Sequence, residues 1–405
     1  MLTSMTVLQM LGNCLMLVLW ICKLPTYTKD MSEVGQVNIE FGDDVSNMLY
    51  QAAKQTYVNR PGAVTELHSS FSGLRAIDPS YKPSDCFELL GSDGVGTKVE
   101  VAERTRDHSS VAHDLFAMVC DDAVVRGAEP IAINTVLDVN KLDENDQLTI
   151  EAIAGIAEGY VAAAALAKVV VLNGELAELG NRIGGYGPFN YNWGATLLSY
   201  AHPERVLAGD KIAPGDMLVG LAENGFRSNG LTDVRRVLGE EFGPMWHEQI
   251  ISELGEASLG QLVQKPSIIY STFVNELTGG YDITKEPVAE VTGVAHITGG
   301  GIPSKLGRML EPSGLGAALL SPQFPAPIMK LVQKLSGMDD REAYGKWNMG
   351  TGMIISSPKP LSIIEHAKTK GIQAEIIGRV TQEPGITIVS EGVEGTGQKL
   401  TFTGK

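Results

Sequence analysis

The stretch "LLGSDGVGTKVEVAERT" (89–105) places a single carboxylate, Asp93, at the end of an apolar run and then opens into a loop with two glycines. Because Gly94 and Gly96 carry no side chains, the backbone of this loop can approach a ligand closely. A helix is expected to begin directly after the loop, and the free N–H groups at a helix start attract anions. We therefore expect a strand, a ligand-binding loop and a helix, with Asp93 placed to bind a hard cation such as Mg²⁺.

The rest of the chain alternates short apolar runs with helix-like segments. The runs "IAINTV" (131–136) and "KVVVLNG" (168–174) are typical of buried strands, whereas "EAIAGIAEGYVAAAALAK" (151–168) has the length and composition of a helix. This alternation predicts an α/β or α+β protein.

The chain of 405 residues is too long for one core, since single cores rarely grow beyond roughly 250 to 300 residues. Prolines and glycines interrupt the pattern in "YAHPERVLAGDKIAPGDM" (200–217), which predicts a domain boundary there. We expect an N-terminal α/β domain over 34–202 and a C-terminal α+β domain over 203–388. The polar, glycine-rich segment 389–405 is expected to be a flexible tail.

Residues 1–33 are expected to be an apolar extension outside the fold. No charged side chain occurs before position 23, and "LMLVLWIC" (15–22) is the most apolar run of the chain. The segment lacks the basic region and cleavage site of a secretory signal, and it is short of the about 20 apolar residues of a spanning helix. A signal or membrane anchor is the alternative interpretation.

Charge and cysteine content exclude several classes of function. The 32 basic and 48 acidic side chains give a net charge of −16, which repels nucleic acids and anionic membranes alike. The four cysteines show no spacing typical of zinc sites or disulfide frameworks. We therefore expect a cytoplasmic protein that binds neither nucleic acid nor membrane, and that needs a metal ion or N–H groups to hold a phosphorylated ligand.

Acidic side chains stand at the ends or edges of three buried segments. Asp121 and Asp122 follow six apolar residues in "HDLFAMVCDDAVVRGAEP" (113–130), so at least one of them is expected to face the interior. A buried carboxylate needs a cation or strong donors beside it, and an ion pair with Arg126 is the simpler alternative to a metal. Glu175 follows the strand "KVVVLNG" just as Asp93 follows its own strand. Together these acids predict a metal and phosphate site.

Glycine-rich segments add candidate phosphate contacts. In "NGFRSNGL" (224–231), Ser228 and Asn229 can cap a following helix, whose N–H groups could receive an anion. In "AHITGGGIPSKL" (295–306), three glycines would let backbone N–H groups close on a phosphate near Lys305. Each segment taken alone could equally be an ordinary turn, since no Walker-type ending is present.

The motifs "SDGVGTK", "RGAEP", "GIAEG", "NGELAE", "RSNG", "AHITGGG" and "NMGTGM" occur in an order and spacing that resembles the aminoimidazole ribonucleotide synthetase family, also called phosphoribosylformylglycinamidine cyclo-ligases. The resemblance covers about residues 34 to 380. It implies an N-terminal domain whose strands form a barrel across a homodimer, a C-terminal α+β domain, and an ATP site in the cleft between them.

The resemblance also implies a reaction and a set of site residues. The formyl oxygen of formylglycinamidine ribonucleotide would attack the γ-phosphate of ATP, and a ring-closing nitrogen would then displace phosphate from the iminophosphate to give aminoimidazole ribonucleotide. Phosphoryl transfer of this kind depends mainly on positioning and charge neutralisation. The implied Mg²⁺ ligands are Asp93, Asp122 and Glu175. The implied catalytic residues are Asp93, Lys98, Arg227 and Asn229, and the implied ATP or phosphate contacts are Gly94, Gly96, Thr97, Gly174, Thr298, Gly299, Gly300 and Gly301.

The chain departs from the family pattern near this expected site. "NGELAE" replaces the usual "GGETAE", which introduces Asn173 and Leu176, and Thr135 stands where the family usually has an aspartate. Arg227 replaces the histidine of "HSNG", and Ile268 replaces the arginine of "PTRIY". We expect Arg227 to hold phosphate, because an arginine cannot serve as a base near neutral pH. A non-catalytic nucleotide-binding paralogue and a related ATP-dependent enzyme with another substrate remain the alternatives.

Overall fold

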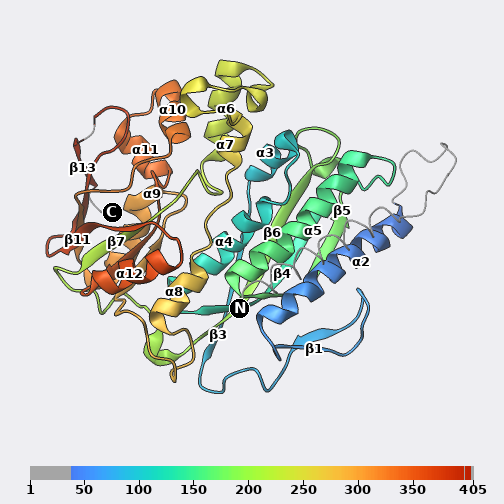
Figure 1. Cartoon of the computed structure of the whole chain (residues 1–405), viewed down its shortest axis with the longest axis horizontal. Helices are drawn as coiled ribbons and strands as arrows, with labels where there is room; N and C mark the ends of the chain where they lie inside the picture. The colour runs from blue at the N-terminus through green and yellow to red at the C-terminus, as the bar shows by residue number, and fades with distance from the viewer. Residues whose placement is uncertain (1–37, 396, 403–405) are drawn as a thin grey trace.

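The computed structural model describes residues 38–395 and 397–402, and the extension expected over 1–33 lies outside these residues. The described chain contains two large sheets, one on each side of the boundary expected at residues 202 and 203 (Figure 1). Four strands form the first sheet and seven form the second. The expectation of an α/β domain followed by an α+β domain is confirmed.

The N-terminal sheet has the order β3-β6-β4-β5. Only the β4–β5 pair is parallel, whereas β3–β6 and β6–β4 are antiparallel. One face of the sheet is covered by three helices, which bury the apolar core of this domain (Figure 1). The strands are β3 (Phe87–Gly94), β4 (Glu129–Val139), β5 (Val170–Glu178) and β6 (Tyr191–Ala201), and the helices are α2 (Ile39–Gln55), α4 (Val111–Val124) and α5 (Gln147–Ala167). A short ribbon of β1 (Val64–Glu66) and β2 (Arg75–Ile77) accompanies them.

Strand register decides which side chains share a face of this sheet. Asp93 is paired with Ala195, which is paired with Thr135, which is paired with Gly174, so these four residues form one row across the sheet. Thr135 contacts the Tyr160 hydroxyl on α5, so the row lies on the helix-covered face. Residues next to the row along each strand point to the opposite face.

Helix α5 is the one described helix that is long and apolar enough to cross a membrane by length and composition. Half of its most apolar window is buried inside the fold, where it packs between α4 and α2. It is therefore explained as a core helix of the N-terminal domain.

The C-terminal sheet has the order β13-β12-β9-β11-β7-β10-β8. Its helices α6, α9, α10 and α11 pack around a large apolar core that includes Trp246 and Trp347. The strands are β7 (Met217–Ala222), β8 (Gly293–His296), β9 (Gly316–Leu319), β10 (Thr351–Ser357), β11 (Ala374–Thr381), β12 (Gly385–Val389) and β13 (Lys399–Phe402). The helices are α6 (Leu231–Phe242), α9 (Gly301–Leu310), α10 (Pro327–Ser336), α11 (Asp340–Lys346) and α12 (Pro360–Thr369).

Two features correct the expected domain organisation. Part of the segment expected to be a flexible tail forms β13, which pairs antiparallel with β12 and buries Leu400 in the C-terminal core. In addition, α7 (Leu259–Gln264) and α8 (Ser271–Thr278) follow the boundary in sequence but pack against α4 and against α3 (Lys98–Thr105) of the N-terminal domain (Figure 1). The C-terminal half of the chain thus completes the N-terminal domain.

Candidate interdomain active site

The loop after β3 has the backbone geometry that its glycines predict. The Asp93 Oδ1 atom accepts a hydrogen bond of 2.7 Å from the N–H of Gly94. Gly96 has a φ of +66°, a left-handed conformation that glycine adopts without strain. A Cβ on Gly96 would stand 3.8 Å from the carbonyl oxygen of Ser228, so this loop of the N-terminal domain lies against the C-terminal domain.

Three helices begin around this contact. Thr97, the N-cap of α3, lies 3.5 Å from the hydroxyl of Thr232 in the first turn of α6. Just before α6, the Asn229 amide lies beside Gly299, where a Cβ would stand 3.4 Å from its nitrogen. Gly299 in turn precedes Gly300, the N-cap of α9. Because helix starts leave backbone N–H groups unpaired and carry partial positive charge, their convergence favours an anionic ligand.

Buried polar atoms accompany these helix starts. Within the described residues, the Ser228 hydroxyl and the Asn229 Oδ1 atom are buried without a hydrogen-bond partner. Thr298 is 5% exposed and directly precedes the three glycines. Unpaired buried polar atoms are costly, so their concentration at one place is consistent with a ligand-binding site.

Two carboxylates and a lysine border the same region. Asp122 lines two cavities, one of about 190 Å³ shared with Asp93 and one of about 280 Å³ shared with His296 and Lys305. Burial raises the pKa of Asp93, the Gly94 N–H opposes that rise, and the charge of Asp122 adds to it. Burial lowers the pKa of Lys305, and the charge of Arg308 lowers it further. Two neighbouring carboxylates that repel each other are stabilised by a shared divalent cation.

Glu175 does not join this pair within one chain. Gly174 belongs to the same row as Asp93, so Glu175, the next residue, points to the opposite face. Strands β6 and β4 also separate β3 from β5, which places the two strands roughly 14 Å apart at about 4.8 Å per strand. Within residues 38–395 and 397–402, no group of three or more His, Cys, Asp or Glu side chains could hold a metal ion. Of the three carboxylates expected to share a site, only Asp93 and Asp122 line the same cavity.

Lys98 is placed differently from its expected role. Its ammonium is fully buried and lies 2.7 Å from Asp114 Oδ1 and 2.7 Å from the carbonyl oxygen of Lys265. Asp114 also accepts hydrogen bonds from the backbone and hydroxyl of Ser267. These contacts give Lys98 a structural position between α4 and the segment after α7, and it lines neither of the two cavities that Asp122 borders.

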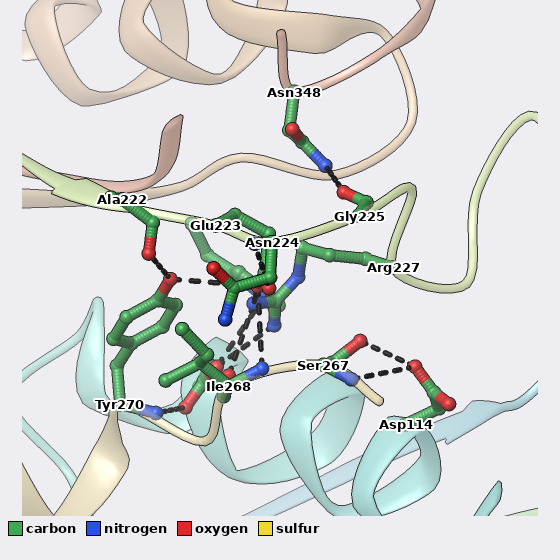
Figure 2. A network of polar contacts seen from close by, with 12 residues as sticks. Asp114, Ala222, Glu223, Asn224, Gly225, Arg227, Ser267, Ile268, Tyr270 and Asn348 are labelled. Carbon is green, nitrogen blue, oxygen red and sulfur yellow. Dashed lines mark hydrogen bonds and ion pairs between the residues drawn. The ribbon is translucent and has the colours of Figure 1, made fainter. Parts of the chain in front are cut away.

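Arg227 also turns away from the expected phosphate contact. Its guanidinium is 1% exposed and donates to Glu223 Oε2 at 2.5 Å (Figure 2). It also donates to Asp121 Oδ2 at 2.9 Å. It also donates to the carbonyl oxygen of Ile268 at 3.1 Å and contacts His296 Nε2 at 2.7 Å. Asp121 is thus the inward-facing acid expected on α4, but its partner is Arg227 and not Arg126. The expectation that Arg227 holds phosphate is not supported, because buried carboxylates already surround the guanidinium.

The departures from the family pattern fall into two places. Thr135, Asn173 and Leu176 line a cavity of about 330 Å³ beside β5, together with Glu175. There Arg75 donates to the Asn173 side chain at 2.8 Å. The other two departures, Arg227 and Ile268, contact each other in the buried network. Ile268 replaces the arginine that is usual in the family, and the Arg227 guanidinium lies close to it.

Sequence reasoning missed the part played by His296. Its ring is buried, its Nδ1 atom lies 2.7 Å from Asp122 Oδ1, and it connects β8 to α4. Burial, followed by the charge of Arg227, lowers the pKa of His296 to about 4. The motif "AHITGGG" contains this residue, but only the glycines after it carried a recognisable signal.

Two domains, converging helix starts and paired carboxylates are features expected of α/β proteins that bind phosphate groups. Comparison with known proteins identifies the family. The AIR synthase related protein N-terminal domain family matches residues 82–193, and the corresponding C-terminal domain family matches residues 213–391. The phosphoribosylformylglycinamidine cyclo-ligase of Acetivibrio thermocellus is 32% identical over 351 residues, covering 86% of this chain and 96% of the relative. That of Symbiobacterium thermophilum is 32% identical over 334 residues, covering 81% and 89%. The chain belongs to the family of phosphoribosylformylglycinamidine cyclo-ligases, which are ATP-dependent ligases.

Solved structures agree with this fold. Thiamine-monophosphate kinase from Stenotrophomonas maltophilia is similar with a TM-score of 0.54 at 13% identity, covering 87% of this chain and 97% of that one. The E. coli hydrogenase maturation protein HypE is similar with a TM-score of 0.56 at 13% identity, covering 89% and 96%.

Proposed function

We propose that this chain catalyses the ATP-dependent cyclisation of formylglycinamidine ribonucleotide to aminoimidazole ribonucleotide, a step of purine biosynthesis. The observation that carries the proposal is the convergence of three helix starts and of Asp93 and Asp122 at the interdomain contact, in a chain similar to cyclo-ligases over most of its length. A cytoplasmic location and a small phosphorylated substrate belong to the same proposal.

The reaction would proceed in two displacements. The formyl oxygen attacks the γ-phosphorus of ATP and ADP leaves, which forms an iminophosphate. A nitrogen of the same molecule then attacks the activated carbon, closes the ring and releases inorganic phosphate. Both steps require charge neutralisation and alignment more than covalent help from the protein.

The residues of this chain supply that alignment. The N–H groups at the starts of α6 and α9 would hold phosphate oxygens, and the absence of side chains at Gly299 and Gly300 lets the backbone come close. Asn229 and Thr298 offer buried polar atoms beside them. Lys305 adds a positive charge near Asp122.

Asp93 and Asp122 are suited to Mg²⁺, which proteins usually hold through one or two carboxylates together with substrate phosphates. When bound, the ion would neutralise charge on the transferred phosphoryl group. Glu175 would not bind the same ion within this chain, because it lies on the opposite face of the sheet from Asp93.

A phosphate-release assay with ATP, Mg²⁺ and formylglycinamidine ribonucleotide tests the proposal, with Asp93→Asn as the decisive variant. Asparagine can still accept the hydrogen bond from Gly94, so we expect near-normal stability. Turnover should fall by roughly 100-fold or more, since losing even an outer partner of a metal ligand costs about 10- to 100-fold. Asp43→Asn on the exposed side of α2 is the matched control.

The outcomes separate the candidate functions. Parent-level turnover by a folded Asp93→Asn variant would place the active site elsewhere. Phosphate release from ATP that does not depend on this ribonucleotide would instead indicate a related enzyme with another substrate. The substitutions that line the cavity beside β5 would then be the first residues to test.

A further inference from the structure

The hydrogen-bond network around Arg227 determines the protonation pattern of a neighbouring histidine. A guanidinium has only donors, so the contact of 2.7 Å between Arg227 Nη2 and His296 Nε2 requires that nitrogen to accept. A neutral imidazole that accepts at Nε2 carries its proton at Nδ1. His296 Nδ1 lies 2.7 Å from Asp122 Oδ1, so this N–H donates to the carboxylate.

The carboxylate at the end of this chain of contacts is the one that faces the cavities. Asp122 keeps half of its side-chain surface exposed, whereas His296 and Arg227 are almost fully buried. The network therefore ends in a carboxylate that the His296 N–H orients at the interdomain site.

The backbone conformation of Arg227 indicates that surrounding contacts fix its position. Arg227 has a φ of +59°, which is uncommon for a residue with a side chain. Two buried carboxylates, Glu223 on the loop after β7 and Asp121 on α4, hold its guanidinium from two domains. Such a conformation persists only where surrounding contacts fix it.

We propose that Arg227 is a positioning residue, which fixes the His296 tautomer so that its Nδ1–H orients Asp122 toward the interdomain cavities. Arg227 itself does not contact these cavities, so it acts through His296. What the oriented Asp122 carboxylate is used for rests on the proposed function. The tautomer of His296 can be observed independently of that function.

Nuclear magnetic resonance of ¹⁵N-histidine-labelled protein at neutral pH tests the tautomer directly, and loss of the signal in His296→Asn assigns it. We expect a protonated Nδ1 and an unprotonated Nε2 in the parent. In Arg227→Met, Nε2 loses its donor and the proton should redistribute between the two nitrogens. Glu223→Gln is the matched control, since it weakens the anchoring of Arg227 but leaves the contact with His296. A parent protonated at Nε2, or an unchanged tautomer in folded Arg227→Met, would overturn the proposal.

A second pair of variants does not disturb Arg227. The amide nitrogen of asparagine occupies roughly the place of a histidine Nδ1, whereas that of glutamine occupies the place of Nε2. We therefore expect His296→Asn to keep the donation to Asp122 and His296→Gln to lose it. Binding of Mg²⁺ with a non-hydrolysable ATP analogue, measured by calorimetry, should weaken about 10- to 100-fold in His296→Gln and remain near the parent in His296→Asn.

Equal losses in both variants would show that His296 is only a structural residue. If the parent itself binds no nucleotide, the proposed function fails while the tautomer measurement still decides the role of Arg227.

Discussion

At the scale of single residues, buried histidines make the stability of this protein depend on pH. Burial lowers the pKa of His108 to about 4, and its ring lies against Phe189 with Nδ1 3.1 Å from the Tyr191 hydroxyl. In an unfolded chain the pKa of a histidine is about 6.5. Between these values the unfolded chain binds a proton that the folded protein does not.

We predict that the free energy of unfolding falls as the pH drops from about 6.5 to 4. The contribution of His108 is fully present above pH 6.5 and amounts to about 3 to 4 kcal/mol at most, for a shift of roughly 2.5 units at 1.36 kcal/mol each. Urea unfolding of the parent and of His108→Gln, at pH 7.5 and pH 4.5, measures it. The decrease should be smaller in the variant, and an equal decrease in both proteins would contradict the assignment.

Sequence patterns located the site residues better than they assigned roles to them. The stretches around Asp93, Asn229 and Thr298 were identified from glycines and polar caps, and the fold brings them together. Lys98 and Arg227 occur in the same motifs, but their charged groups form ion pairs with buried carboxylates. Whether a long basic side chain turns outward or inward depends on partners outside its own motif, since Asp114 lies 16 residues from Lys98 and Asp121 lies 106 residues from Arg227.

At the scale of elements, β13 is a strand that the composition of its segment does not predict. The segment after residue 389 is polar and rich in glycine, which predicts a loose tail. The four residues of β13 nevertheless alternate so that Leu400 is buried, and Arg341 donates to the Thr401 carbonyl oxygen at 2.6 Å. A strand this short is recognisable only once β12 is available to pair with it.

We predict that Leu400→Ala lowers the free energy of unfolding by about 2 to 4 kcal/mol, because it removes a buried side chain from the C-terminal core. Thr401→Ala is the matched control on the exposed face of the same strand and should change stability by no more than about 0.5 kcal/mol. Chemical denaturation of both variants provides the measurement. Equal, small effects would mean that β13 does not contribute to the core in solution.

At the scale of the whole molecule, the N-terminal sheet has one face that the helices do not cover. Leu90 and Val136 are 75% and 47% exposed there, since each lies an odd number of residues along its strand from the row that contains Asp93 and Thr135. Exposed apolar side chains on an uncovered sheet are typical of an interface.

We predict a homodimer through this face at micromolar concentration, as measured by light scattering. Leu90→Arg should shift the protein toward monomer, because a charge would be buried at the interface. Leu361→Arg on α12 is the matched control, since Leu361 is 65% exposed on the C-terminal domain. A monomeric parent would contradict the prediction.

The packing of α7 and α8 on the N-terminal domain has a consequence for synthesis on the ribosome. Asp121 receives a hydrogen bond from Tyr270, 149 residues later in the chain, and Asp114 receives one from Ser267. At about 5 to 20 residues per second, these partners emerge roughly 8 to 30 s after the carboxylates. The first half of the nascent chain must therefore wait for the second before its interior is complete, and the period of waiting is when chaperones would matter most.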